Sequence, residues 1–120
     1  MDEYYLIIEL TIRLLVAGIL GALVGFDRER QAKEAGYRTH FLVAVGSALM
    51  MIISQYGFLF LDYAGGIEKY DPSRIAAQVV SGIGFIGAGT IILQRNQIVR
   101  GLTTAAGLWA TAGIGLAIGG

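Results

Sequence analysis

Two charged residues lie inside the first long apolar stretch of the chain and are the first candidates for chemistry. Glu9 and Arg13 are four residues apart with the acid first, which is the favourable order for an ion pair on one helix. Charges inside a membrane span are rare and commonly functional. The alternative is a snorkelling or mutually neutralised pair that fixes this helix among its neighbours. Arg13 could also reach a polar group elsewhere, such as Gln78.

A second polar pair lies in the third apolar stretch. Gln78 and Ser81 are three residues apart, so they share one face of a helix. They could line an ion pathway together with Glu9 and Arg13. More often such groups hydrogen-bond between helices, at roughly 0.6 kcal/mol each. We favour this structural role.

The segment 82–87, GIGFIG, matches the G-x-G-x-x-G pattern of dinucleotide-binding loops. That site needs an acidic residue about 20 positions downstream to bind the ribose. No acidic residue follows Asp71 in this chain. The flanking segments also leave no room for the βαβ unit that carries such a loop. The pattern therefore does not predict a nucleotide site.

Other chemistry finds little support in the residue types. The chain has no cysteine and a single histidine, His40, so thiol catalysis and thiolate metal sites are excluded. Magnesium takes oxygen ligands, commonly from one or two carboxylates, but Glu9 is the only carboxylate within an apolar stretch. We expect no catalytic residues, no metal site, no cofactor and no nucleic-acid partner, and hence a protein that is not an enzyme.

The elements that carry these residues are apolar segments. Of the 120 residues, 55% are hydrophobic and 15% are charged, whereas a soluble domain has about 25% charged residues. Each apolar segment is about as long as the roughly 20 residues that cross a bilayer, and none has the polar stripe of a soluble bundle helix. The sequence predicts an all-α membrane domain, 1–120, with helices at about 5–26, 39–61, 73–93 and 101–120.

Small residues recur on these segments and predict close helix packing. Every fourth residue from Thr103 to Gly119 is small, and Asp71 can cap the third helix, followed by Arg74 in its first turn. Such faces serve contacts within the bundle or with a second copy, and the spacing does not separate these. The glycines expected to mediate packing are Gly21, Gly25, Gly82, Gly84, Gly87, Gly89, Gly107 and Gly115.

The basic residues predict the orientation. Six of them lie in the links after the first and third segments, against two in the remaining link and none in the tail before the first segment. The positive-inside rule places the six in the cytoplasm and the N-terminus outside. The first link could bind anionic lipid or a partner protein, or could only set topology, through the residues Arg28, Glu29, Arg30 and Arg38.

Three blocks of the chain resemble the MgtC/SapB family of bacterial inner-membrane proteins. They are LVGFDRERQAKEAGYRTHFLVAVGSAL (23–49), DPSRIAAQVVSGIGFIGAGTII (71–92) and VRGLTTAAGLWATAGIGLAIG (99–119). The family motif covers Arg28, Glu29, Arg30, Gly36, Arg38, Thr39, Asp71, Arg74, Gln78, Gly82, Gly84, Gly87, Gly89, Gly101, Thr103, Thr104 and Trp109.

The resemblance implies a multi-pass membrane protein that serves adaptation to low magnesium, acid stress and virulence. Many members are named magnesium transporters, whereas regulation of other membrane machinery, including the proton-driven ATP synthase, is the better-supported role. Many members also continue with a further helix and a C-terminal cytoplasmic domain, so we expect either a short member or the membrane domain alone.

Together these observations predict a non-enzymatic protein of the bacterial inner membrane. It would lie in membrane lipid, form a homodimer and bind other inner-membrane proteins. The alternative is a transporter or channel for magnesium or another ion, with Glu9, Arg13 and Gln78 along its path.

Overall fold

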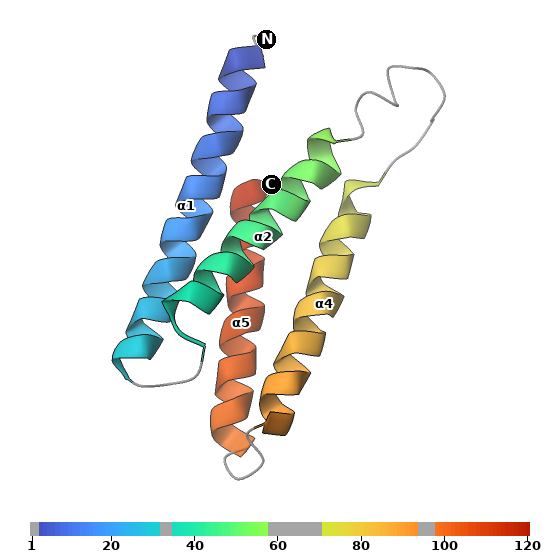
Figure 1. Ribbon diagram of the computed structural model, residues 1–120. Coiled ribbons are helices and arrows are strands. Elements are labelled where there is room, and N and C mark those ends of the chain that lie inside the picture. Colours follow the sequence, from blue (N-terminus) through green and yellow to red (C-terminus); the bar gives the residue numbers. More distant parts are fainter. Residues whose placement is uncertain (1–2, 32–34, 58–70, 94–97) are drawn as a thin grey trace.

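The computed structural model describes residues 3–31, 35–57, 71–93 and 98–120, and these form four helices (Figure 1). They are α1 (Glu3–Arg30), α2 (Tyr37–Tyr56), α4 (Pro72–Leu93) and α5 (Ile98–Gly119). Each is long and apolar enough to cross a membrane, whose hydrocarbon core is roughly 30 Å thick. The prediction of an all-α protein with four candidate membrane helices is confirmed.

Local signals fix where two of the helices begin and end. At the start of α4, the Asp71 carboxylate accepts hydrogen bonds from the backbone N–H of Ser73 at 2.9 Å and from its hydroxyl at 2.6 Å. Pro72 follows at the first helical position, where a backbone N–H has no helical partner to lose. At the C-terminal end of α2, the backbone N–H of Gly57 donates to the carbonyl of Ile53 at 2.8 Å.

The first helix is longer than expected. It runs on through Arg30, so the segment DRER forms its last turn and is not part of the link predicted to follow residue 26. Arg28 and Arg30 lie at the carboxyl end of α1, where basic side chains interact favourably with the helix dipole. The charges that look like a link in the sequence therefore extend the helix.

Two helices form the centre of the bundle. α2 and α5 run in the same direction and are flanked by α1 and α4 (Figure 1). α2 and α5 each pack against all three other helices. One third of the apolar part of α2 and of α5 is buried, against 11% of that of α4. α4 is therefore the helix with most surface left for lipid or for another protein.

Small residues lie inside the bundle and large apolar residues cover its outside. Ala17, Ala44 and Ala48 are fully buried, whereas Leu23 and Phe85 are 61% and 83% exposed. A soluble protein has the opposite distribution. In lipid, large apolar side chains gain nothing by turning inward, and small ones let helices approach closely.

Backbones approach most closely where α1 and α5 meet α2. A methyl group added to Gly21 would lie 2.6 Å from the carbonyl oxygen of His40, and one added to Gly119 would lie 2.5 Å from that of Ala48. At Gly115 it would overlap the carbonyl oxygen of Ala44, and at Gly25 the backbone of Gly36 and Tyr37. At these positions the obstructing atoms are backbone atoms, which cannot move aside as a flexible side chain does.

The change Gly115→Ala should therefore separate α5 from α2. We expect it to lower the free energy of unfolding in detergent by about 1–3 kcal/mol, the usual cost of overpacking. Gly113→Ala on the same helix is the matched control, because a methyl group there meets nothing within 4 Å in the described structure. The control should be neutral or stabilising by up to about 1 kcal/mol, since alanine is the better helix former. Equal stability of the two variants would contradict this packing.

Candidate functional site

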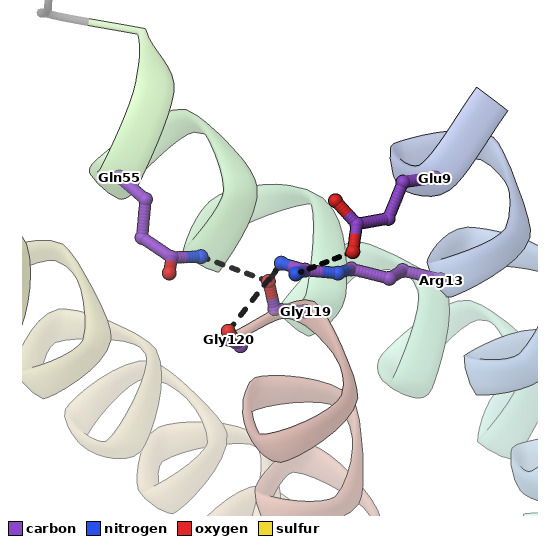
Figure 2. A network of polar contacts seen from close by, with 5 residues as sticks. All are labelled: Glu9, Arg13, Gln55, Gly119 and Gly120. Carbon is purple, nitrogen blue, oxygen red and sulfur yellow. Dashed lines mark hydrogen bonds and ion pairs between the residues drawn. The ribbon is translucent and has the colours of Figure 1, made fainter. Parts of the chain in front are cut away.

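One end of the bundle holds a polar cluster centred on Arg13 (Figure 2). Its guanidinium donates to the carbonyl oxygens of Gly119 at 2.9 Å and Gly120 at 3.3 Å. The Glu9 carboxylate lies 3.4 Å from the same group, on the adjacent turn of α1. Arg13 therefore bonds Gly119, at the end of α5, and the adjacent Gly120 to α1.

Gln55 joins this cluster from α2. Its side-chain amide donates to Gly119 at 2.8 Å and to Met51 on its own helix at 3.3 Å. Gln55 was not among the residues predicted to carry chemistry. Its sequence context offers one indication, because it is the sole amide in the apolar run MMIISQY. An amide in such a run indicates a buried hydrogen-bond partner but does not identify that partner. Through Gln55 and Arg13, three helices meet at one backbone oxygen.

The Glu9 and Arg13 side chains border an open hollow. It has a volume of about 630 Å³ and is lined by Tyr5, Ile8, Glu9, Ile12 and Arg13. Glu9 is half exposed there, with 54% of its side chain accessible, and within the described residues its polar contact is the ion pair with Arg13. A half-exposed pair of this kind contributes little stability, so its carboxylate remains available to a ligand or to water.

Gln78 and Ser81 do not reach this cluster. Both are exposed on α4, and α4 packs against α2 and α5 with scarcely any contact to α1. Arg13 instead turns toward α5. The suggested contact between Arg13 and Gln78 is therefore wrong, because α2 and α5 lie between the helices that carry them.

The opposite end of the bundle holds a buried cation, Arg28. It is only 9% exposed, and its guanidinium donates to the hydroxyl of Thr104 on α5. The prediction that Arg28 lies in the link after the first helix is therefore wrong, because α1 continues through Arg30 and brings Arg28 into the helix interface. Glu29 and Arg30 remain exposed at the end of α1, and Arg38 lies over the ring of Tyr37 at the start of α2.

His40 is fully buried beside this end. Its Nδ1 lies 3.0 Å from the carbonyl oxygen of Gly36. A carbonyl only accepts hydrogen bonds, so Nδ1 is the donor in this contact. Nε2 finds no hydrogen-bond partner in the described part of the chain. It faces Gly107, where an added methyl group would lie 3.8 Å away.

A line of buried polar side chains follows the contact between α2 and α5. His40, Ser47 and Ser54 recur every seventh residue on α2, and Thr104 and Thr111 do so on α5, all at most 5% exposed. A seven-residue repeat keeps residues on the same side of a helix that packs along another. Thr111 is satisfied within its helix, because its hydroxyl donates to Gly107 at 2.8 Å.

The glycines of α4 differ from those that meet α2. Gly87 faces α5, with Ala105 3.2 Å from the position of an added methyl group. Gly84 lines an apolar groove of about 360 Å³ between α4 and α5, together with Gly87 and Trp109. At Gly82, Gly84 and Gly89 an added methyl group meets nothing within 4 Å in the described structure.

The capping residue Asp71 precedes the candidate membrane span of α4, which begins at Ser73. Hydrogen bonds from the side chain and backbone of Ser73 lower the pKa of Asp71 below its ordinary value, so this carboxylate is charged at neutral pH. Arg74 is exposed one residue further on. In the described ranges, no three acidic, histidine or cysteine residues gather as a metal site would require. Asp62 and Glu68 lie outside those ranges.

Comparison with known sequences identifies the family. A profile of the MgtC family matches residues 14–120. The chain belongs to the MgtC family. The match covers α2, α4, α5 and the part of α1 from residue 14 onward, so it includes Arg28 and Thr104 but neither Glu9 nor Arg13.

Individual relatives agree with this assignment. YhiD of Escherichia coli (strain K12), whose name proposes a magnesium transporter, is 55% identical over 92% of this chain. Protein MgtC of Salmonella typhimurium is 44% identical over 99%, and Protein SapB of Bacillus subtilis 37% identical over 98%. The chain spans about half the length of these relatives, from 47% to 51%. No solved structure matches it.

Replacing Arg13 should test the first cluster of this MgtC-family protein. Arg13→Met removes the donors to Gly119 and Gly120, and we expect it to lower the free energy of unfolding in detergent by roughly 1.5–3 kcal/mol. Glu9→Gln removes only the half-exposed ion pair and should cost about 0–1 kcal/mol. A larger loss for Glu9→Gln than for Arg13→Met would show that the ion pair, and not the bond to α5, is the stabilising contact.

Replacing Thr104 should test the second cluster. Thr104→Val keeps the shape of the side chain but removes the acceptor of Arg28, and we expect a loss of about 1–3 kcal/mol in the free energy of unfolding. The control is Thr90→Val, because the Thr90 hydroxyl donates at 3.1 Å to Ile86 on its own helix. The control should change stability by less than about 1 kcal/mol. Indistinguishable variants would exclude a stabilising bond between α1 and α5 at this end.

Proposed function

We propose that this MgtC-family protein is not an enzyme and acts by binding other proteins of the bacterial inner membrane, as a homodimer. The observation that supports this most directly is the packing between α1, α2 and α5. Glycine brings backbone against backbone at Gly21, Gly115 and Gly119, which leaves little room for a water-filled path through the bundle centre. A closely packed bundle is suited to presenting helix surfaces to partners.

The placement of the polar residues also supports binding over transport. An ion path through Glu9, Arg13 and Gln78 would need these side chains to converge. Arg13 is instead bonded to the end of α5, and Gln78 is exposed on α4. The basic end of the bundle, with Arg30 and Arg38 exposed, offers a second surface for a partner or for anionic lipid.

The family resemblance gives this proposal its biological setting. We infer a role in adaptation to low magnesium, to stress and to the host environment, by modulation of membrane machinery such as the proton-driven ATP synthase. The N-terminus would lie outside the cell and the basic end in the cytoplasm, following the positive-inside rule.

Transport of magnesium or another ion is the second candidate. The name of YhiD proposes magnesium transport for that relative. The hollow beside the half-exposed Glu9 carboxylate is the feature of this chain that favours it. Carboxylate oxygens are magnesium ligands, and magnesium keeps several of its waters when it binds, so a wide hollow with one acid could admit a hydrated ion.

Flux measurements on purified protein in sealed liposomes separate the two candidates. We expect no protein-dependent flux of magnesium or of protons, because the interior is closely packed. In parallel, cross-linking in the native membrane should recover a membrane-protein partner. The variants Glu9→Gln and Gln78→Ala should leave the flux at its background level.

The opposite result would be a flux that both of these variants abolish. Gln31→Ala serves as the control, because the Gln31 amide donates to Asp27 at 3.2 Å at the exposed end of α1, away from both Glu9 and Gln78. Flux that survives Gln31→Ala but not Glu9→Gln or Gln78→Ala would replace the binding proposal with the transport one.

A further inference from the structure

The outer face of α4 has an unusual composition. Gln78 and Gly87 are nine residues apart, which is about two and a half helical turns, so they project from opposite sides of the helix. Gly87 faces Ala105 of α5, and Gln78 therefore points away from the bundle. The residues that share this outward direction are Gln78, Ser81, Gly82, Phe85, Gly89 and Ile92; we call them the outer face of α4.

Contact with lipid does not explain this face. Where α1 is exposed it carries large apolar residues such as Leu15, Ile19 and Leu23, each about 60% exposed. The outer face of α4 instead has an amide, a hydroxyl and two glycines. The described structure offers no hydrogen-bond partner to Gln78 or Ser81, and an amide without a partner is unfavourable in hydrocarbon. Such a face needs a polar partner.

We propose that the outer face of α4 binds the outer face of α4 in a second copy of the chain. This inference rests on the homodimer of the proposed function and assigns its interface. Two copies inserted in the same orientation are related by an axis along the membrane normal. Each residue of α4 then meets its counterpart at the same depth. Gln78 faces Gln78, and because an amide both donates and accepts, the two can bond reciprocally.

The rest of the face fits the same arrangement. Nothing in the described structure lies within 4 Å of a methyl group added at Gly82 or Gly89, so a second backbone can approach there. Phe85, which is 83% exposed, lies between them on the same face and would be covered by the contact. No charge occurs between residues 75 and 93, so joining like faces brings no like charges together. A different partner would need a polar group at the matching depth.

Cysteine cross-linking tests the interface directly, because the natural chain has no cysteine. Single variants Ser81→Cys and Phe85→Cys, expressed in full-length protein in native membranes, should form disulfide-linked dimers under mild oxidation. The controls are Ile83→Cys, on the buried side of α4, and Ile19→Cys, which is 60% exposed on α1. Both controls should remain monomeric under the same conditions.

A second measurement tests the role of the amide. Adding Gln78→Leu to the Phe85→Cys variant removes the two reciprocal hydrogen bonds but keeps an apolar side chain of similar size. Each such bond is worth about a threefold change in association, so dimer affinity should fall by roughly five- to tenfold. Thr90→Val in the same background should leave the affinity unchanged.

The outcomes distinguish this interface from the proposed function. Dimers that form through Ile19→Cys but not through Ser81→Cys or Phe85→Cys would preserve the homodimer and overturn this interface. Cross-links from the outer face of α4 to a different protein, with no dimer, would also overturn it. No cross-link from any position would overturn both the interface and the homodimer.

Discussion

The bundle depends on how closely α2 approaches its neighbours. In lipid the hydrophobic effect does not draw helices together, because the surrounding chains are as apolar as the side chains. Attraction then comes from many short contacts, and these form only where side chains are absent. Gly21 and Gly25 of α1 and Gly115 and Gly119 of α5 meet backbone atoms of α2 or of the link before it. These contacts set the spacing of α1 and α5 from α2.

Polar groups are confined to where this packing allows them. Arg13 and Gln55 satisfy carbonyl oxygens at one end of α5, and Arg28 bonds Thr104 near the other. Between these ends, the hydroxyl of Thr111 bonds within its own helix. His40 is the exception, because its Nε2 faces Gly107 without a partner in the described residues. A buried nitrogen without a hydrogen-bond partner lowers the stability of the fold, so His40 is an energetically unfavourable position of the interior.

The sequence predicted the helices well and their contacts poorly. Hydropathy and length identify four spans because lipid forces each segment to satisfy its own backbone. The end of α1 was misplaced because charged residues in a final helical turn look like a link. Spacing along one helix relates Glu9 to Arg13, but it carries no information about Gly119, which is 106 residues from Arg13. The glycines likewise looked equivalent until the structure separated those facing α2 from those facing outward.

Arg13 and Arg28 have a joint consequence for motion. They lie fifteen residues apart on α1, roughly 22 Å along the helix axis at 1.5 Å per residue, and each is bonded to a different end of α5. α1 therefore fixes the distance between the two bonded positions of α5. Sliding of α5 along its own axis would break one of the two attachments. In the described part of the chain α4 scarcely touches α1, so neither of these two attachments involves it. The two attachments thus keep α1 and α5 in a fixed register along the bundle.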